Sequence, residues 1–459
     1  MTSINDAWRA VGGEPGLLSR VSAVVRRDAL DARLPVRDLA RACVGACALA
    51  AAELGARRAG LAEAPAVTVD DGAVAAAFRS ERLLQVDGRA PDVFAPLSRF
   101  WRTADGWVRT HANYPHHRAR LLGAVGLPQD ASVEQVADRL AEHSALETEE
   151  TVYSAGGLAV ALRTPEEWQA HEQAAEVAAR PLVERERLDA APARVLPPLD
   201  PGAAVLLPAA GLRVLDLTRV LAGPVATRTL ALLGADVLRV DAPGLPELPD
   251  QHADTGFGKR SATLDLGADP DAFEELLSTA DVVVNGYRPG ALDRFGLSPK
   301  ALAARRPGLV VAQVSAWGAY GPWGGRRGFD SLVQAATGIA VTEGAAGEPG
   351  ALPAQALDHG TGYLLAAAVL RALTEQSSEG GSRLVRLALA RTARWLTAGI
   401  VPSAAAEGAP YPGPDVWLAE TDGPLGRLRH ARPAVSFGGG PTGWERPPVP
   451  WGSDPATWR

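Results

Sequence analysis

Residues 211–391 alternate short runs of branched apolar residues with glycine-containing turns and longer amphipathic segments. The run RVLDLT is followed by LAGPVATRTLALLGA, then by DVLRVDAP, and the alternation continues through DVVVNGY and GLVVAQVSAWG. Strands separated by helices form a parallel sheet with crossovers, because a tight turn cannot join parallel neighbours. The sequence therefore predicts an α/β, doubly wound, nucleotide-binding-like parallel sheet with its ligand at the carboxyl ends of the strands. The turns concerned follow Leu217, Val240, Asn285 and Ser315.

The rest of the chain is divided by composition. At ~150 residues per domain, 459 residues suggest two or three domains. Residues 1–187 are predicted to form a smaller α+β domain with flanking helices, and residues 188–210, rich in Pro and Ala, a linker. The doubly wound domain then spans residues 211–400. The Pro-, Gly- and Trp-rich tail, residues 401–459, should wrap back onto another domain, because four exposed tryptophans would leave much apolar surface in water.

Local patterns predict several elements before the linker. Apolar residues at helical spacing indicate a helix within residues 30–62. Residues 100–114 are typical of a β-hairpin around the Asp105-Gly106 turn. Further helices are expected over residues 132–142 and 165–179.

Charge and targeting signals exclude some classes of protein. A formal charge of −7 and a pI near 5.7 argue against a nucleic-acid-binding surface, which needs a concentrated basic field. The first residues lack a signal-peptide pattern, and the longest apolar stretch, residues 42–52, is too short to span a bilayer. We therefore expect a cytoplasmic protein with no membrane partner. Cys43 and Cys47, one helical turn apart, are expected to be small buried apolar side chains rather than metal ligands or a disulfide.

The turn after the first strand of the 211–391 region has the chemistry of an anion site. It reads Val220-Leu221-Ala222-Gly223-Pro224 and leads into a helix. Gly223 permits close backbone approach, and the unpaired N–H groups at the start of the helix can face an anion. The turn lacks the G-x-G-x-x-G spacing of a dinucleotide site, so Asp241 is a poor candidate for a ribose ligand.

Four cations follow turns of the predicted sheet and are expected to meet over one rim, where a phosphate-rich ligand would fit. The alternative for each is a solvated charge paired with an acid. The four are Lys259, Arg260, Arg288 and Arg294.

Five segments together resemble CoA-transferase family III, also called the carnitine-dehydratase and bile-acid-inducible group, which includes α-methylacyl-CoA racemases. They are GLRVLDLTRVLAGPVATRTLALLGADVLRVD, GKRSATLDL, DVVVNGYRPGALDRFGL, RRPGLVVAQVSAWGAYGP and GFDSLVQAATG. The resemblance implies coenzyme A as substrate, exchanged between an acyl-CoA and a carboxylic acid. Implied CoA-binding residues are Val220, Leu221, Ala222, Lys259, Arg260, Tyr287, Arg288 and Arg294. Where family members carry a basic residue after the second strand, this chain has Ala242.

The chain order differs from that of the family. Segments resembling the family's small domain, within residues 100–182, precede the linker, whereas members begin with the nucleotide-type domain. The chain therefore resembles two family halves in altered order. Family members form interlocked dimers, which implies either a homodimer or an equivalent contact within one chain.

The resemblance implies a carboxylate nucleophile that forms an acyl-enzyme anhydride. It places this group in the loop after GFDSLVQAATG, where the candidate is Glu348. Asp330 is the second candidate, since its GFD setting resembles the acid of the racemase branch, and its alternative is a helix cap. Asp358 is interpreted as a helix cap.

Two other functions stay open. Racemase or lyase chemistry would need a partner for the acid, and no histidine lies between His252 and His359. The third hypothesis is an acyl-CoA-binding protein that has lost catalysis. No metal is expected, because the histidines at 111, 116 and 117 lack nearby acids or cysteines and begin in a hairpin. A solvated or CoA-facing role is expected for them instead.

Overall fold

The computed structural model describes residues 2–403 and 408–459 and is built on a seven-stranded sheet. Its order is β11-β10-β9-β12-β13-β14-β8, with six parallel strands and β8 antiparallel at one edge. The strands are β9 (Arg213–Leu217), β10 (Asp236–Asp241), β11 (Arg260–Thr263), β12 (Val282–Asn285), β13 (Val310–Ser315), β14 (Arg383–Ala388) and β8 (Glu184–Arg187). The predicted α/β class with a large parallel sheet is confirmed. The chain winds outward from β9 to β11 and returns to β12 beside β9, so the winding direction reverses there.

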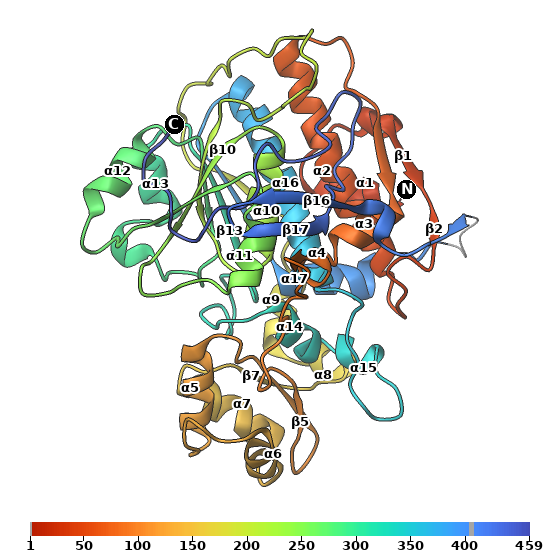
Figure 1. Cartoon of the computed structure of the whole chain (residues 1–459), viewed down its shortest axis with the longest axis vertical. Helices are drawn as coiled ribbons and strands as arrows, with labels where there is room; N and C mark the ends of the chain where they lie inside the picture. Colours follow the sequence, from red (N-terminus) through yellow and green to blue (C-terminus); the bar gives the residue numbers. More distant parts are fainter. Residues whose placement is uncertain (1, 404–407) are drawn as a thin grey trace.

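Helices cover both faces of this sheet, as Figure 1 shows. Successive strand residues point to opposite faces, so Val214 packs in one core and Leu215 in the other. The first face is covered by α10 (Ala222–Leu232) and α16 (Ala356–Glu379), and the second by α12 (Pro270–Ser278) and α13 (Pro299–Arg305). The β-rich runs are nearly continuous in apolar residues because both of their faces are buried.

An outer helix, α2 (Val36–Ala59), packs on α16, and α1 (Thr2–Ala10) packs on α2. Small residues allow this close packing, and a Cβ added at Gly360 would lie 3.5 Å from the Cys43 sulfur. Both cysteines are buried and form no disulfide, as predicted. By length and composition α2 could cross a membrane, but almost all of its residues are buried inside the protein.

A separate lobe lies below the sheet in Figure 1 and has its own apolar core. It contains β5 (Phe100–Arg102), β6 (Trp107–Thr110), β7 (Ala159–Ala161), α5 (Pro115–Ala124), α6 (Val133–Ala141) and α7 (Ala145–Ser154). The predicted hairpin is present, closed by a bond from the Thr103 N–H to the Gly106 carbonyl. The helix expected over residues 165–179 is broken into α8 (Pro165–Gln169) and α9 (Glu172–Ala178), because the His171 imidazole caps α9.

The structure divides the predicted 1–187 unit between two cores. Residues up to Phe78 join the core of the main body, whereas residues 97–159 supply most of the lobe core. The elements between α2 and the lobe are β3 (Val67–Asp70), α3 (Asp71–Ala77), α4 (Ser80–Leu83) and β4 (Gln85–Val86). The Pro-rich segment 188–210 is held by Arg58, whose guanidinium donates to the carbonyls of Pro197, Pro208 and Ala210.

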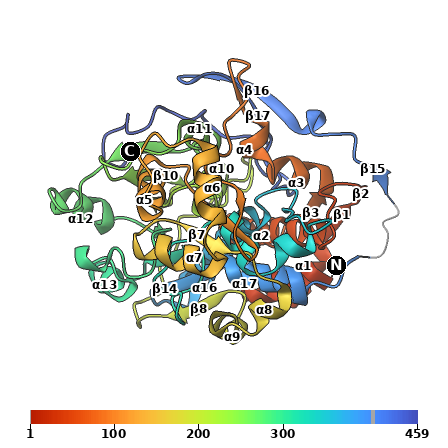
Figure 2. The same ribbon diagram turned by 90° about the horizontal axis from the view of Figure 1, so that it is seen from below.

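The tail contains a hairpin of β16 (Leu418–Gly423) and β17 (Gly426–Ala431) that pairs with β4. Figure 2 shows this hairpin beside α4 and α11 (Pro249–Thr255). The last residues then run across the body. The indole N–H groups of Trp444, Trp451 and Trp458 donate to the Arg228 carbonyl, the Asp241 carboxylate and the Leu276 carbonyl at 2.9 to 3.0 Å.

Candidate active site

A cleft of about 900 Å³ lies at the carboxyl ends of the strands, beside the lobe. The turns after β9, β10, β12 and β13 contribute to it, as predicted from their sequence. Six of the predicted binding residues line it, namely Val220, Leu221, Ala222, Tyr287, Arg288 and Arg294. The lobe adds Tyr114, His116, His117 and Arg120. A CoA-facing position was one of the two roles expected for the histidines, whereas Tyr114 and Arg120 were not predicted. In Figure 2, seen from below, the lobe helices lie in front of the sheet.

The turn that enters α10 has a constrained backbone. Val220 has a φ of 70°, which is unusual for a branched residue, and its N–H donates to the Glu247 carboxylate at 3.0 Å. A Cβ at Gly223 would lie 2.4 Å from the Thr218 Cβ, so only glycine fits there. The turn is thus held in one conformation at the edge of the cleft.

Glu247 joins this turn to the lobe. Its buried carboxylate accepts hydrogen bonds from Val220, from the Tyr114 hydroxyl and from Arg239 at 2.9 Å. Burial alone would raise its pKa, but Arg239 and Arg219 lower it to about 2. The cluster is therefore an ionised buried acid with several charged and polar partners.

Four arginines form a positive group in the cleft: Arg120, Arg288, Arg294 and Arg327. None of them forms an ion pair with a carboxylate of residues 2–403 or 408–459. Burial lowers the pKa of Arg327, and the charges of Arg288 and Arg120 lower it further. Concentrated positive charge without acidic partners is typical of an anion-binding surface.

Two of the four predicted cations lie elsewhere, and the prediction that all four meet is wrong. Lys259 precedes β11 at its amino end and is buried, with its Nζ 2.9 Å from Asp216 and 2.6 Å from Thr227. Its ammonium therefore ties α10 to β9. Arg260 pairs with Asp236 at 2.9 Å. Neither residue lines the cleft, because the amino end of a parallel strand lies at the edge opposite to the site.

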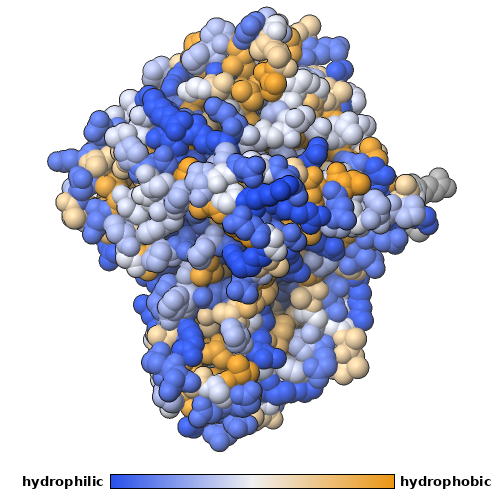
Figure 3. Space-filling model, viewed as in Figure 1, coloured by the Kyte–Doolittle hydropathy of each residue, from blue (hydrophilic) through white to orange (hydrophobic). Residues whose placement is uncertain are grey.

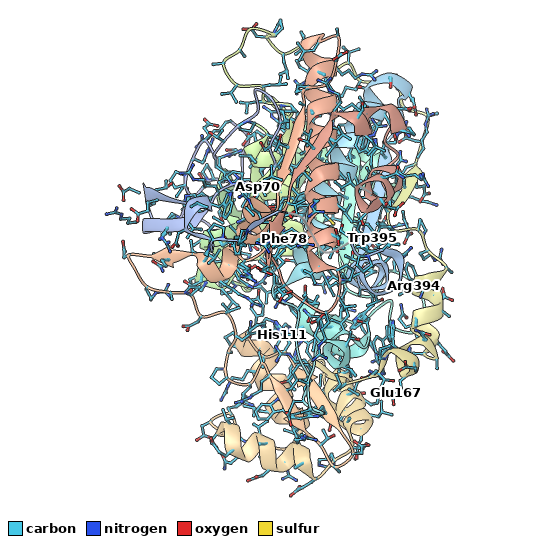
Figure 4. All side chains as sticks on the ribbon, turned by 90° about the vertical axis from the view of Figure 1, so that its right-hand side faces the viewer. Asp70, Phe78, His111, Glu167, Arg394 and Trp395 are labelled. Atoms are coloured by element: carbon cyan, nitrogen blue, oxygen red, sulfur yellow. The ribbon has the colours of Figure 1, made fainter. Side chains whose placement is uncertain are left out.

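The histidines form an aromatic wall. His116 and His117 line the cleft, and the His111 ring stacks on Phe329 at 3.7 Å between ring centres. Figure 4 shows His111 where the lobe meets the body. Burial lowers the pKa of His111 to about 3 and that of His117 to about 2, so both imidazoles are neutral near pH 7. Within residues 2–403 and 408–459, no group of three His, Cys, Asp or Glu side chains could hold a metal ion.

Asp330, a predicted catalytic residue, does not line the cleft. It is the first residue of α14 (Asp330–Ala336), and its fully buried carboxylate accepts the N–H groups of Leu357 and Asp358, both at 2.9 Å. Burial raises its pKa to about 6. The Asp330 side chain therefore caps the first turn of α16 and not α14, the helix that it begins. This position corrects its assignment as a catalytic residue.

Glu348, the other predicted nucleophile, lies outside the cleft. It pairs with Arg102 at 2.8 Å, and both side chains are about 60% exposed. The loop folds back on itself through an Ala345–Glu348 bridge and contacts the lobe hairpin, where Trp107 donates to the Gly347 carbonyl. The structure therefore places Glu348 at the lobe surface, and its geometry gives no support to the assignment as nucleophile.

Asp358 was predicted to be a helix cap, but its side chain reaches the cleft. It lies in the first turn of α16, lines the cleft and is buried. Among the described residues none donates a hydrogen bond to its carboxylate, whereas Asp241 in the same cleft is paired with Arg239 at 2.7 Å. Burial raises its pKa well above the usual range, and the charges of Asp330 and Glu81 raise it further. A cap and a cleft residue both occur at a helix start, so the sequence could not separate the two roles.

Parts of the chain are similar to proteins named as CoA transferases. The chain is 37% identical over 202 residues to the probable fatty acyl-CoA transferase Rv3272 of Mycobacterium tuberculosis, covering 40% of this chain and 50% of that protein. It is 36% identical over 198 residues to the acetyl-coenzyme A transferase nodX of Hypoxylon pulicicidum, covering 41% of this chain and 33% of that protein. The formyl-CoA:oxalate CoA-transferase of Rhodopseudomonas palustris is 34% identical over 194 residues, covering 39% of this chain and 45% of that protein.

The chain thus spans half or less of the length of these three relatives. A crystal structure of Rv3272 from Mycobacterium tuberculosis is 36% identical and has a TM-score of 0.41, covering 43% of this chain and 58% of that one. The family model described as CoA-transferase family III matches residues 16–193 and 209–415, two segments separated within the predicted linker. Because these segments make up most of the chain, the protein belongs to CoA-transferase family III.

Proposed function

We propose that this chain transfers coenzyme A between an acyl-CoA and a carboxylic acid, with Asp358 as the nucleophile. The observation that carries this proposal is the buried Asp358 carboxylate, which lines the cleft without a hydrogen-bond donor from the described residues. A carboxylate that is poorly solvated and not neutralised by a cation is a stronger nucleophile than one in an ion pair.

The transfer of CoA proceeds in four steps. The Asp358 carboxylate attacks the thioester carbonyl, the C–S bond breaks, and CoA leaves as a thiolate while an acyl-aspartyl anhydride forms. The thiolate then attacks the aspartyl carbonyl, which gives aspartyl-CoA and releases the first acid. The acceptor carboxylate attacks aspartyl-CoA, forms a second anhydride and again releases the thiolate. Attack of this thiolate on the acceptor carbonyl yields the new acyl-CoA and restores Asp358.

The cleft offers contacts for the rest of the CoA molecule. The arginine group of Arg120, Arg288, Arg294 and Arg327 can hold its phosphates. The turn at residues 220–222 presents backbone groups at the start of α10. We infer that the reversal of strand order beside β9 makes the sheet doubly wound and places the nucleotide part at its carboxyl edge.

The test is to trap the acyl-enzyme. Incubation with acyl-CoA and hydroxylamine should give an acyl hydroxamate with the wild-type chain and none with Asp358→Asn. Glu348→Gln is the matched control, because this exposed acid lies outside the cleft and should leave trapping unchanged. Equal trapping by Asp358→Asn and the wild type would refute the nucleophile assignment.

Exchange of the α-proton is a second candidate, favoured by one observation. His116 and His117 line the same cleft as Asp358, so an acid and a histidine can face one substrate. Deuterium from heavy water would then enter the acyl-CoA without any CoA exchange. Transfer chemistry instead predicts exchange of labelled acid into the thioester.

A further inference from the structure

We infer that the acyl group accepted beside Asp358 is uncharged and apolar, so that the substrate is the CoA thioester of a monocarboxylic acid without a second charge. This inference rests on the proposed function. It concerns only the part of the cleft around Asp358, which is bounded by three walls and has negative charge nearby.

The first wall comes from α10. Gly362 follows Asp358 by one helical turn on the same face of α16. A Cβ at Gly362 would lie 2.6 Å from the Ala222 carbonyl and 2.9 Å from the Val225 Cβ, so α10 passes very close to this face. The start of α10 therefore places Leu221 and Ala222, which line the cleft, beside Asp358.

The other two walls come from α14 and α17 (Leu389–Arg394). Phe329 precedes Asp330, whose carboxylate accepts the Asp358 N–H at 2.9 Å, so the chain brings Phe329 next to the nucleophile. The hydroxyls of Thr361 and Thr392 are bonded at 2.7 Å, which fixes α17 against α16 and holds Leu389 at the cleft. The side chains that these walls contribute, Leu221, Ala222, Phe329 and Leu389, are apolar.

Two cations of the cleft lie beside the lobe histidines. Arg120 and Arg327 lie close enough to His116 and His117 to lower the pKa of each imidazole. The charges that act on Asp358 are instead the carboxylates of Asp330 and Glu81. A second carboxylate on the acyl group would meet apolar side chains and the negative charge of Asp330 and Glu81 there.

Butyryl-CoA and succinyl-CoA distinguish an uncharged from a charged acyl group, since both carry four-carbon acyl groups and only succinyl-CoA has a charged end. Binding of each thioester is measured by calorimetry on Asp358→Asn, which cannot convert the substrate. The value of kcat/KM is measured on the wild type with acetate as the acceptor acid. We expect kcat/KM for butyryl-CoA to exceed that for succinyl-CoA by roughly 10²-fold or more, and butyryl-CoA to bind at least about 10-fold more tightly. The reason is that the terminal carboxylate of succinyl-CoA would be an unpaired charge at an apolar site. Equal or better binding of succinyl-CoA would overturn the inference.

The binding arm keeps this result separate from the proposed function. Tight butyryl-CoA binding without any turnover would refute transfer chemistry and leave the acyl-group inference standing. Leu389→Arg places a cation at the wall and should shift the binding ratio toward succinyl-CoA by about 10-fold. Leu146→Arg adds the same charge on the exposed face of α7, where the side chain is 62% exposed, and should leave the ratio unchanged.

Discussion

Replacing Glu247 by glutamine tests how the cleft is held together. The carboxylate accepts from Val220, Tyr114 and Arg239, so it connects the CoA turn, the lobe and the sheet. The amide of Glu247→Gln keeps a similar shape, but it loses the negative charge and presents an N–H group toward one of these donors. Arg239 retains Asp241 at 2.7 Å, while Arg219 loses its acidic neighbour at 3.6 Å.

The magnitude follows from the pKa of Glu247. Its value is lowered from 4.5 to about 2, and the side chain is fully buried. At about 1.4 kcal/mol per pKa unit, the charged form stabilises the fold by about 3 kcal/mol at neutral pH. Because the folded pKa is below the unfolded one, this contribution is complete above about pH 4.5 and is lost as the pH falls through about 2. Breaking a buried pair by removal of one partner costs a similar amount.

Urea unfolding of the wild type and Glu247→Gln at several pH values measures this contribution. The free energy of unfolding should differ by about 3 kcal/mol at pH 7, and the difference should shrink between pH 4.5 and pH 2. Glu348→Gln removes an exposed ion pair and should change the free energy by less than about 0.5 kcal/mol. A Glu247→Gln protein as stable as the wild type at pH 7, or a difference that persists unchanged at pH 2, would refute the reasoning.

Three other predictions concern the cleft. Arg288→Ala and Arg327→Ala should each raise KM for CoA thioesters about 10-fold at low salt, since a charge-assisted contact is worth about 1.5 to 3 kcal/mol, and less at high salt; initial rates at two ionic strengths check this. Gly223→Ala should lower the free energy of unfolding by about 1 to 3 kcal/mol in urea titrations, because its Cβ would lie 2.4 Å from that of Thr218. Because burial raises the pKa of Asp358, kcat/KM should rise with pH through a pKa above the usual value for aspartate, about 3.9; an acidic limb at or below this value would contradict the assignment.

The main sheet and its binding turns could be predicted from the sequence. Strand runs such as VVVN are apolar throughout because both faces are buried, and each is bounded by turn residues. The carboxyl ends of parallel strands share one edge, so Val220 and Tyr287 were correctly expected to face one cleft. The hydropathy of the surface does not indicate where the binding turns lie, since hydrophobic patches in Figure 3 are scattered among hydrophilic residues.

Contacts between distant segments could not be predicted. The pairing of Tyr114 with Glu247 joins residues 133 positions apart, and neither local pattern signals the other. The same reason explains why Asp330 was predicted to be a catalytic residue and Asp358 a helix cap. Asp330 and Asp358 both lie in the first turn of a helix, and only the folded chain shows that one caps α16 while the other lines the cleft. The error at Lys259 was avoidable, because Lys259 precedes β11 in the chain and therefore lies at the amino end of that strand, opposite the cleft.

The most direct test of the account follows oxygen from the acceptor acid. When an acceptor with both carboxylate oxygens labelled as oxygen-18 is turned over with an acyl-CoA, one labelled oxygen should remain on the aspartate after the second anhydride is cleaved. Peptide mass spectrometry should find a gain of one oxygen-18 in the fragment that contains Asp358, and none in a fragment that contains Asp241. Turnover that leaves Asp358 unlabelled, or that labels another carboxylate, would contradict its role as the nucleophile.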